Sequence, residues 1–230
     1  MKISKTYLKK LILEGLRMNE DLMLIQIDSG GAVCFILAKN NYKLHIWDKN
    51  YFLNIMLGMC KMNDAMNPCN GAKAIALGAA EEGYGPTLYD IVMEVTPYPL
   101  INDRLDVSEP MQNMMQFYLD NRPDVEKKLL DNMYDPGDYP RTPDTSDDCV
   151  PGDSQTYEFG VNTKKSIMWE EDPLSYSYNK PASWNIAKMK AAGDDFLAKY
   201  SPNIAELLSI ADDFFLIKSQ EYEKKQKMVK

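Results

Sequence analysis

The residues best suited to do chemistry lie together in Glu81 to Val95, which reads EEGYGPTLYDIVMEV. Gly83 and Gly85 can adopt a positive φ and let another group come close to the backbone. Pro86 suits the first position of a helix, so we expect a helix to begin there. The N–H groups of such a turn have no helical partner and lie at the positive end of the helix, where a phosphate can bind. The same residues also fit a glycine-rich turn between a strand and a helix that binds no ligand.

The flanking residues predict the two elements that would hold this turn in place. Leu88, Ile91, Val92 and Val95 have helical spacing and form one apolar face, and Pro97 follows them. The short run of small residues from Ala74 to Ala79 predicts a strand that leads into the turn.

The chain before this strand has the pattern of a β-sheet. The runs LMLIQID and AVCFILA are separated by Ser29-Gly30-Gly31, which predicts an antiparallel hairpin. Tyr42 to Asp48 is predicted to be a third strand. The apolar run from Tyr51 to Met62 fits either a strand or a short helix, and its length does not decide between them.

After the central helix the pattern changes several times. We predict a brief strand over Tyr98 to Asn102, a helix over Glu109 to Asn121 with Ser108 as its N-cap, and a further helix over Asp124 to Met133. The residues from Tyr134 to Ser154 are rich in Asp, Pro, Gly, Ser and Thr, which favours an extended acidic loop.

Helices are predicted at both ends of the chain. Ser4 to Leu16 forms a basic amphipathic pattern, Ser183 to Tyr200 is predicted to be helical, and a long last helix should begin with Ser201 as N-cap and Pro202 at its first position. The organisation we expect is a domain over residues 1–133, an acidic loop region over 134–180 that packs on it through Trp169, and C-terminal helices over 181–230.

Composition excludes several classes of function. The net charge of −8 over 230 residues argues against duplex nucleic acid as a partner, since that requires a basic face. The cysteines are too widely spaced for a C-x-x-C pair, and we expect reduced thiols, no secretory signal peptide and no membrane span. The single histidine, His45, removes most zinc geometries, so we expect no metal site. The cysteines are Cys34, Cys60, Cys69 and Cys149.

The order of these elements resembles that of the GCN5-related N-acetyltransferase family. The segments that carry the resemblance are GAKAIALGAAEEGYGPTLYDIVMEV and LINDRLDVSEPMQNMMQFYLDNRPDV. They are similar to acetyltransferase-like proteins of tailed bacteriophages, which share a glycine-tyrosine-glycine-proline turn, a leucine-tyrosine-aspartate helix and a later tyrosine-x-x-asparagine-arginine segment. The resemblance covers Pro68 to Asp131 and, more weakly, Trp169 to Pro181. It implies an α+β fold, with a mixed, mainly antiparallel sheet flanked by helices and a C-terminal helical extension.

The same resemblance implies a binding site for acetyl-CoA. Tyr118, which follows Phe117, would be the acid that protonates the departing thiolate, since a tyrosine with its ordinary pKa of about 10 can donate a proton at neutral pH. Glu81 or Glu82, or a water that they hold, would be the general base. The residues facing the phosphates would be Gly83, Tyr84, Gly85, Thr87 and Leu88, and those along the pantetheine arm would be Ala76, Leu77, Gly78 and Ala79.

Some positions depart from the family pattern and leave two functions open. Ala80 stands where family members usually have Gln or Arg, and Asn121-Arg122 replaces the usual glycine-phenylalanine. Glu81 and Glu82 place negative charge beside the phosphates. Pro86 lacks an N–H that could donate to them. The first function is an acyl-CoA-dependent N-acyltransferase with an unknown amine acceptor. The alternative is an inactive scaffold, either a virion component or a factor that binds phage or host proteins through the N- and C-terminal helices. Both place the protein in the host cytoplasm or the virion.

Overall fold

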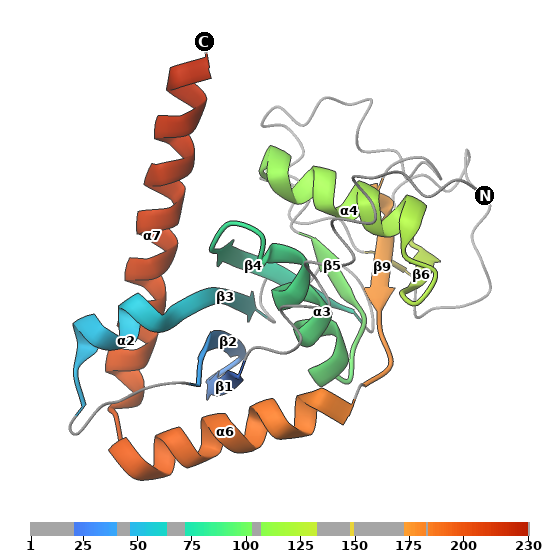
Figure 1. Cartoon of the computed structure of the whole chain (residues 1–230). Coiled ribbons are helices and arrows are strands. Elements are labelled where there is room, and N and C mark those ends of the chain that lie inside the picture. Colours follow the sequence, from blue (N-terminus) through green and yellow to red (C-terminus); the bar gives the residue numbers. More distant parts are fainter. Residues whose placement is uncertain are drawn as a thin grey trace.

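The computed structural model describes residues 21–40, 47–63, 72–102, 107–132, 148–149, 173–182 and 184–229. The helix predicted over Ser4 to Leu16 lies outside these ranges, as do most of the strand predicted over Tyr42 to Asp48, nearly all of the acidic loop, and Trp169. The described residues form a central β-sheet with helices on both faces (Figure 1).

The sheet has seven strands in the order β1-β2-β3-β4-β5-β9-β6. Neighbouring strands are antiparallel except for β4 and β5, which are parallel. An α+β fold with a mainly antiparallel sheet is therefore confirmed. The strands are β1 (Leu22–Ser29), β2 (Ala32–Lys39), β3 (Met56–Asn63), β4 (Lys73–Ala80), β5 (Leu100–Asn102), β6 (Glu126–Leu129) and β9 (Tyr176–Asn179); β7 (Asp131–Asn132) pairs separately with β8 (Asp148–Cys149).

The predicted hairpin is confirmed in β1 and β2. Gly30 and Gly31 have φ values of 51° and 100°, which a two-residue turn requires and glycine adopts without strain. Both faces of β1 are apolar, because Leu22 and Leu24 pack in one hydrophobic cluster while Met23 and Ile25 pack in the other. A strand buried on both faces needs helices on both sides of the sheet.

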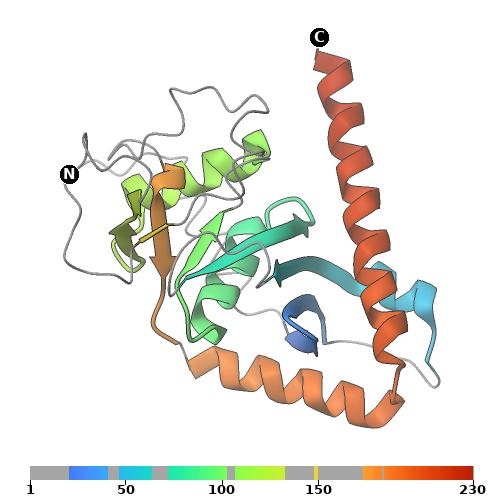
Figure 2. The same ribbon diagram turned by 180° about the vertical axis from the view of Figure 1, so that it is seen from behind.

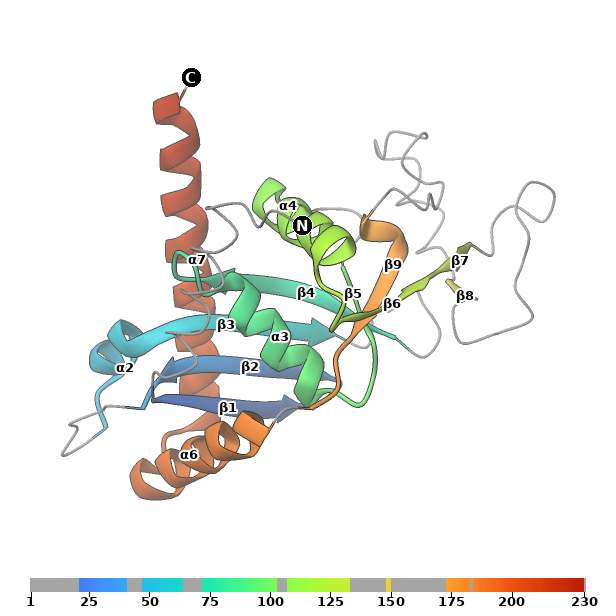
Figure 3. The same ribbon diagram turned by 45° about the vertical axis from the view of Figure 1, so that its right-hand side comes forward.

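The helices supply this cover. Figure 3 shows α3 (Gly85–Val95) in front of the sheet and α7 (Ile204–Val229) behind it, with α6 (Trp184–Tyr200) running beside β1. A Cβ at Gly193 of α6 would lie 2.1 Å from the carbonyl oxygen of Leu24, so glycine lets this helix lie directly against the edge strand. An edge covered in this way is protected from pairing with another chain. The remaining helices are α2 (Lys49–Ile55), α4 (Glu109–Asn121) and the short 3-10 helix η2 (Pro173–Ser175).

Two sequence predictions are resolved or corrected between residues 51 and 133. The apolar run from Tyr51 to Met62 contains both alternatives, since α2 ends at Ile55 and β3 begins at Met56.

The helix predicted over Asp124 to Met133 is wrong. Its first part is β6, which pairs antiparallel with β9 in a register that places Lys128 opposite Ser177. This short polar strand is set by a partner far along the chain, which local spacing does not reveal.

The start of the last helix also differs from the prediction. Ser201 is not its N-cap: it has a φ of 45°, and its N–H donates to the carbonyl of Leu197 at 2.8 Å, so it ends α6. Asn203 caps α7 instead, because its side-chain oxygen accepts a hydrogen bond from the Ala205 N–H at 2.8 Å.

The C-terminal helices are more than an extension of the fold. Phe196 of α6 and Leu207, Ile210 and Phe214 of α7 are buried in the cluster that covers the rear face of the sheet. The last turns of α7 run past the sheet, as seen from the front and from behind (Figures 1 and 2). Among the described helices, none combines the length and hydrophobicity that a membrane crossing would need.

Candidate functional site

The turn between β4 and α3 lies where the sequence predicted it, with a positive φ at Gly83 but not at Gly85, which is the first residue of the helix. Gly83 has a φ of 85°, and the Tyr84 N–H donates to the Glu81 carbonyl at 2.9 Å, which closes the turn. Helix α3 begins at Gly85 with a proline in its first turn, and Leu88 N–H donates to the Tyr84 carbonyl at 2.9 Å. The N–H groups of Gly85 and Thr87 precede that bond and lie at the positive end of the helix.

The two carboxylates before the turn pair with lysines of α7. Lys218 Nζ lies 2.8 Å from Glu81 Oε1, and Lys225 Nζ lies 3.2 Å from Glu82 Oε2. Burial alone would lower the pKa of Lys218, but its hydrogen bonds to Glu221 and Glu81 outweigh this and raise it. Helix α7 therefore compensates the negative charge beside the turn. The sequence reasoning missed both lysines, because no local signal connects them to residues more than a hundred positions earlier.

Strand β4 has a different partner arrangement on each edge. On the β3 side, Lys61 pairs with Leu77 and Met62 with Ile75, so Ala76 is an extra residue in a β-bulge. On the β5 side, the pairs end with Ile75 opposite Asn102. Ala76, Leu77, Gly78 and Ala79, the residues predicted to lie along pantetheine, are half-buried and follow the last β5 pair in the described part of the chain.

Asn102 ends β5 and is buried without a hydrogen bond. Its side chain is 2% exposed, and neither its Oδ1 nor its Nδ2 has a partner within the described structure. A buried polar group left unpaired costs about 1–3 kcal/mol. The sequence reasoning did not single out this residue, although a polar residue in the brief apolar strand LIN was a visible signal.

Tyr118, the predicted acid, is fully buried in α4. Its hydroxyl lies 2.8 Å from Asp90 Oδ1 and 2.9 Å from the Pro86 carbonyl, so its single proton has two acceptors. Burial, and then the charge and hydrogen bond of Asp90, raise the pKa of Tyr118 well above its ordinary value. The ordinary pKa on which the acid role was argued therefore does not apply to this environment, and that role stays a prediction.

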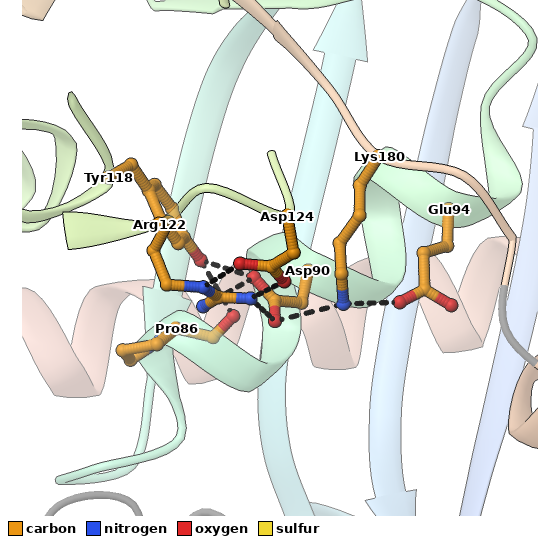
Figure 4. A network of polar contacts seen from close by, with 7 residues as sticks. All are labelled: Pro86, Asp90, Glu94, Tyr118, Arg122, Asp124 and Lys180. Carbon is orange, nitrogen blue, oxygen red and sulfur yellow. Dashed lines mark hydrogen bonds and ion pairs between the residues drawn. The ribbon is translucent and has the colours of Figure 1, made fainter. Parts of the chain in front are cut away.

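Asp90 is the centre of a polar network that joins α3, α4 and the end of β9 (Figure 4). The Arg122 guanidinium contacts both Asp90 carboxylate oxygens, at 2.7 and 3.3 Å, and also pairs with Asp124. Lys180 binds Asp90 at 3.2 Å and also pairs with Glu94 one helical turn away. The leucine-tyrosine-aspartate and tyrosine-x-x-asparagine-arginine motifs thus meet at one carboxylate. The contacts of Asp90 with Tyr118 and Arg122 hold α3 and α4 in position.

Comparison with known proteins gives no further assignment: no protein-family model, curated protein or solved structure matches the chain. The case for a function therefore depends on the chemistry of the site itself.

The thiols near the sheet are poorly suited to covalent chemistry. Cys34 and Cys60 are buried, and burial raises the pKa of Cys34 to about 12 and that of Cys60 further. The thiolate is the nucleophile, so both are inert near neutral pH. No cluster of three or more His, Cys, Asp or Glu side chains in the described ranges could hold a metal ion. Within the described residues, the arrangement offers backbone donors at a helix end, a strand whose β5 pairs end at Ile75, and the unpaired amide of Asn102.

Proposed function

We propose that this protein is an acyl-CoA-dependent N-acyltransferase of the GCN5-related type, which binds its cofactor along β4 and at the turn into α3. The observation that carries the proposal is the course of β4. Within the described residues, this strand pairs with its parallel neighbour β5 as far as Ile75, and it then continues to a glycine turn at a helix N-terminus. In the family that the sequence resembles, the equivalent strand pairs with pantetheine and the equivalent turn binds the pyrophosphate.

The ion pairs of α7 remove one objection to this proposal. Unpaired carboxylates at Glu81 and Glu82 would repel a pyrophosphate. Each carboxylate has a lysine partner, and the N–H groups of Gly85 and Thr87 stay at the positive end of the helix. Pro86 still lacks a donor, which leaves the phosphates one fewer N–H than they could otherwise use.

Direct attack by the acceptor amine fits the inert thiols. The amine nitrogen would form a bond to the thioester carbonyl carbon, the carbon–sulfur bond would break, and the thiolate would leave. The proton lost by the amine would end on the thiol of coenzyme A. No covalent acyl-enzyme is needed for this balance.

Titration calorimetry with acetyl-CoA tests the proposal, using two variants that each place a side chain at a positive φ. Gly83→Ala does so at a φ of 85° in the turn, whereas Gly30→Ala does so at a φ of 51° in the β1–β2 hairpin, where a Cβ would touch nothing within 4 Å. We expect both to lower stability by about 1 kcal/mol. Only Gly83→Ala should weaken binding, by about tenfold or more.

Failure of the wild-type protein to bind acetyl-CoA would contradict the proposed enzyme function. If the wild-type protein gives no heat and no thermal shift with millimolar acetyl-CoA, the cofactor assignment is wrong. If Gly30→Ala weakens binding as much as Gly83→Ala, the effect comes from lost stability and the turn is not the site.

The second candidate is a contact protein, and the outer part of α7 favours it. Leu216, Ile217 and Met228 are 56%, 40% and 83% exposed, and they lie on the half of the helix beyond its buried residues. The relation to phage proteins, and with it a place in the virion, comes from the sequence resemblance. A fixed copy number of the chain in purified particles would support this candidate, and wild-type turnover of acetyl-CoA would argue against an inactive scaffold.

A further inference from the structure

Among the described residues, Asn102 has a buried side chain whose nitrogen and oxygen both lack a hydrogen-bond partner. We propose that it binds the reacting end of the thioester, with Nδ2 donating to the acyl carbonyl oxygen and Oδ1 accepting from the acceptor amine. This inference rests on the proposed cofactor site and adds a residue to it.

The position of Asn102 along β4 fits this role. Asn102 pairs with Ile75, and the glycine turn follows the other end of the strand at Ala80. Five residues of a strand span about 17 Å. An extended pantetheine arm that begins at the turn and follows β4 therefore brings its thioester to the level of Asn102. The β-bulge at Ala76 lies at the same level.

The direction of the side chain follows from strand alternation. Leu100 packs in the hydrophobic cluster that contains the α3 residues, whereas Ile101 packs with Ala72, Ala74 and Leu130 in a separate cluster. Successive side chains of a strand point to opposite faces, so Asn102 points to the same face as Leu100. Asn102 is thus placed on the α3 side of the sheet, at the last β4–β5 pair of the described residues.

The chemistry of a carboxamide matches the two groups that must meet. A thioester carbonyl accepts a hydrogen bond, and an amine can donate one, so Nδ2 and Oδ1 would each gain the partner that the described protein does not provide. A donor fixed near the carbonyl oxygen also stabilises the charge that develops there when the amine attacks. Apolar side chains of this size would pack in the same space but would offer neither bond.

The Asn102→Leu variant gives a test with two readouts of opposite sign. Leucine has nearly the same size and leaves no polar atom unpaired, so we expect the melting temperature of the free protein to rise. Affinity for acetyl-CoA relative to coenzyme A, which lacks the acyl carbonyl, should fall about tenfold. Asn113→Leu, on the exposed side of α4, is the control and should leave the ratio unchanged. Asn102→Ala repeats the affinity measurement if leucine does not fit.

The outcomes separate this inference from the function on which it rests. If the wild-type protein binds both ligands but Asn102→Leu and Asn102→Ala keep the wild-type ratio, Asn102 does not contact the acyl group and the inference is wrong. If the wild-type protein binds both ligands with equal affinity, the inference is also wrong while the cofactor site stands. Failure of the wild-type protein to bind either ligand overturns both proposals.

Discussion

Asp90 and Asn102 are polar side chains on the same side of the sheet, and the fold treats them in opposite ways. Asp90 accepts hydrogen bonds from Tyr118, Arg122 and Lys180. Asn102 is more deeply buried, and its carboxamide has no hydrogen-bond partner among the described residues. Buried polar groups in proteins are nearly always paired. Asp90 follows this rule and is stabilised by its network, whereas the unpaired carboxamide of Asn102 lowers the stability of the fold. That contrast is what distinguishes a residue that holds helices together from one that is available to a ligand.

The two positions also act on α3 in different ways. The Asp90 network joins the middle of α3 to α4 and to the end of β9, and the Tyr118 hydroxyl reaches the Pro86 carbonyl in its first turn. A helix fixed along its length presents its N-terminal N–H groups in a constant place. Such preorganisation lowers the entropy cost of binding a phosphate at that end.

Removal of the Asp90 carboxylate should have the largest effect. Asp90→Ala leaves the Arg122 and Lys180 charges, which are 14% and 15% exposed, without their shared partner. We expect the free energy of unfolding to fall by about 3 kcal/mol, because hydrogen bonds to a charged carboxylate are lost from Tyr118, Arg122 and Lys180, although Arg122 keeps Asp124 and Lys180 keeps Glu94. Urea denaturation measures this change, and Asn102→Leu should shift the midpoint in the opposite direction.

Asp120→Ala is the matched control for Asp90→Ala. Asp120 lies on the exposed side of α4, where its carboxylate contacts Gln116 at 3.1 Å. Its loss should change stability by about 0.5 kcal/mol or less. Equal costs for the two variants would mean that the network does not hold α3 and α4 together.

Removal of the Tyr118 hydroxyl is expected to have a smaller effect, and it tests the acid role directly. Tyr118→Phe deletes one donor to Asp90 while Arg122 and Lys180 remain, so stability should fall by about 1 kcal/mol. We expect affinity for acetyl-CoA to be retained. The acid role is decided by the rate: a fall in kcat of about a hundredfold with unchanged KM in Tyr118→Phe would establish Tyr118 as the acid. Tyr98→Phe, at a ring that is 46% exposed, controls for the loss of a hydroxyl.

The elements that the sequence predicted correctly are those with a local cause. The β1–β2 hairpin follows from alternating apolar runs around two glycines, and α3 follows from a glycine-proline start and apolar residues at helical spacing. The turn between β4 and α3 was found for the same reason. Each of these signals lies within a dozen residues, where spacing alone fixes which side chains can meet.

The features that were missed depend on residues far apart in the chain. Strand β6 has the polar sequence EKKL and takes its conformation from pairing with β9. The lysine partners of Glu81 and Glu82 come from the last helix. In each of these cases the physical cause is a contact that exists only after the sheet has formed, so no local pattern could predict it. Asn102 differs, because a polar residue in the apolar run LIN was visible in the sequence, and only its burial without a side-chain partner depends on the folded structure.

The lysines of α7 give a graded test of the charge compensation beside the turn. Lys218 is 18% exposed and binds both Glu81 and Glu221, whereas Lys225 is 69% exposed and its partner Glu82 is 90% exposed. Lys218→Ala should lower stability by about 0.5–1 kcal/mol, and Lys225→Ala should have almost no effect. Lys218→Ala should also weaken binding of acetyl-CoA, most clearly at low salt. Equal binding by wild type and Lys218→Ala would show that Glu81 points away from the phosphates.

The smallest expected effect is a dependence of stability on acidic pH. The hydrogen bond from Arg122 lowers the pKa of Asp124 below its ordinary value of 3.8. Below that value the unfolded chain binds a proton that the folded protein still excludes, so this contribution is present above the unfolded pKa and is lost as pH falls through the folded one. Asp124 is 49% exposed, so we expect the contribution to be well below about 1 kcal/mol. Asp124→Asn should be slightly less stable than the wild type near pH 6, and the two urea midpoints should converge as the pH falls below the pKa of Asp124 in the folded protein. If the two urea midpoints differ by the same amount across this pH range, the effect of Asp124 comes from its packing against Arg122 and not from its charge.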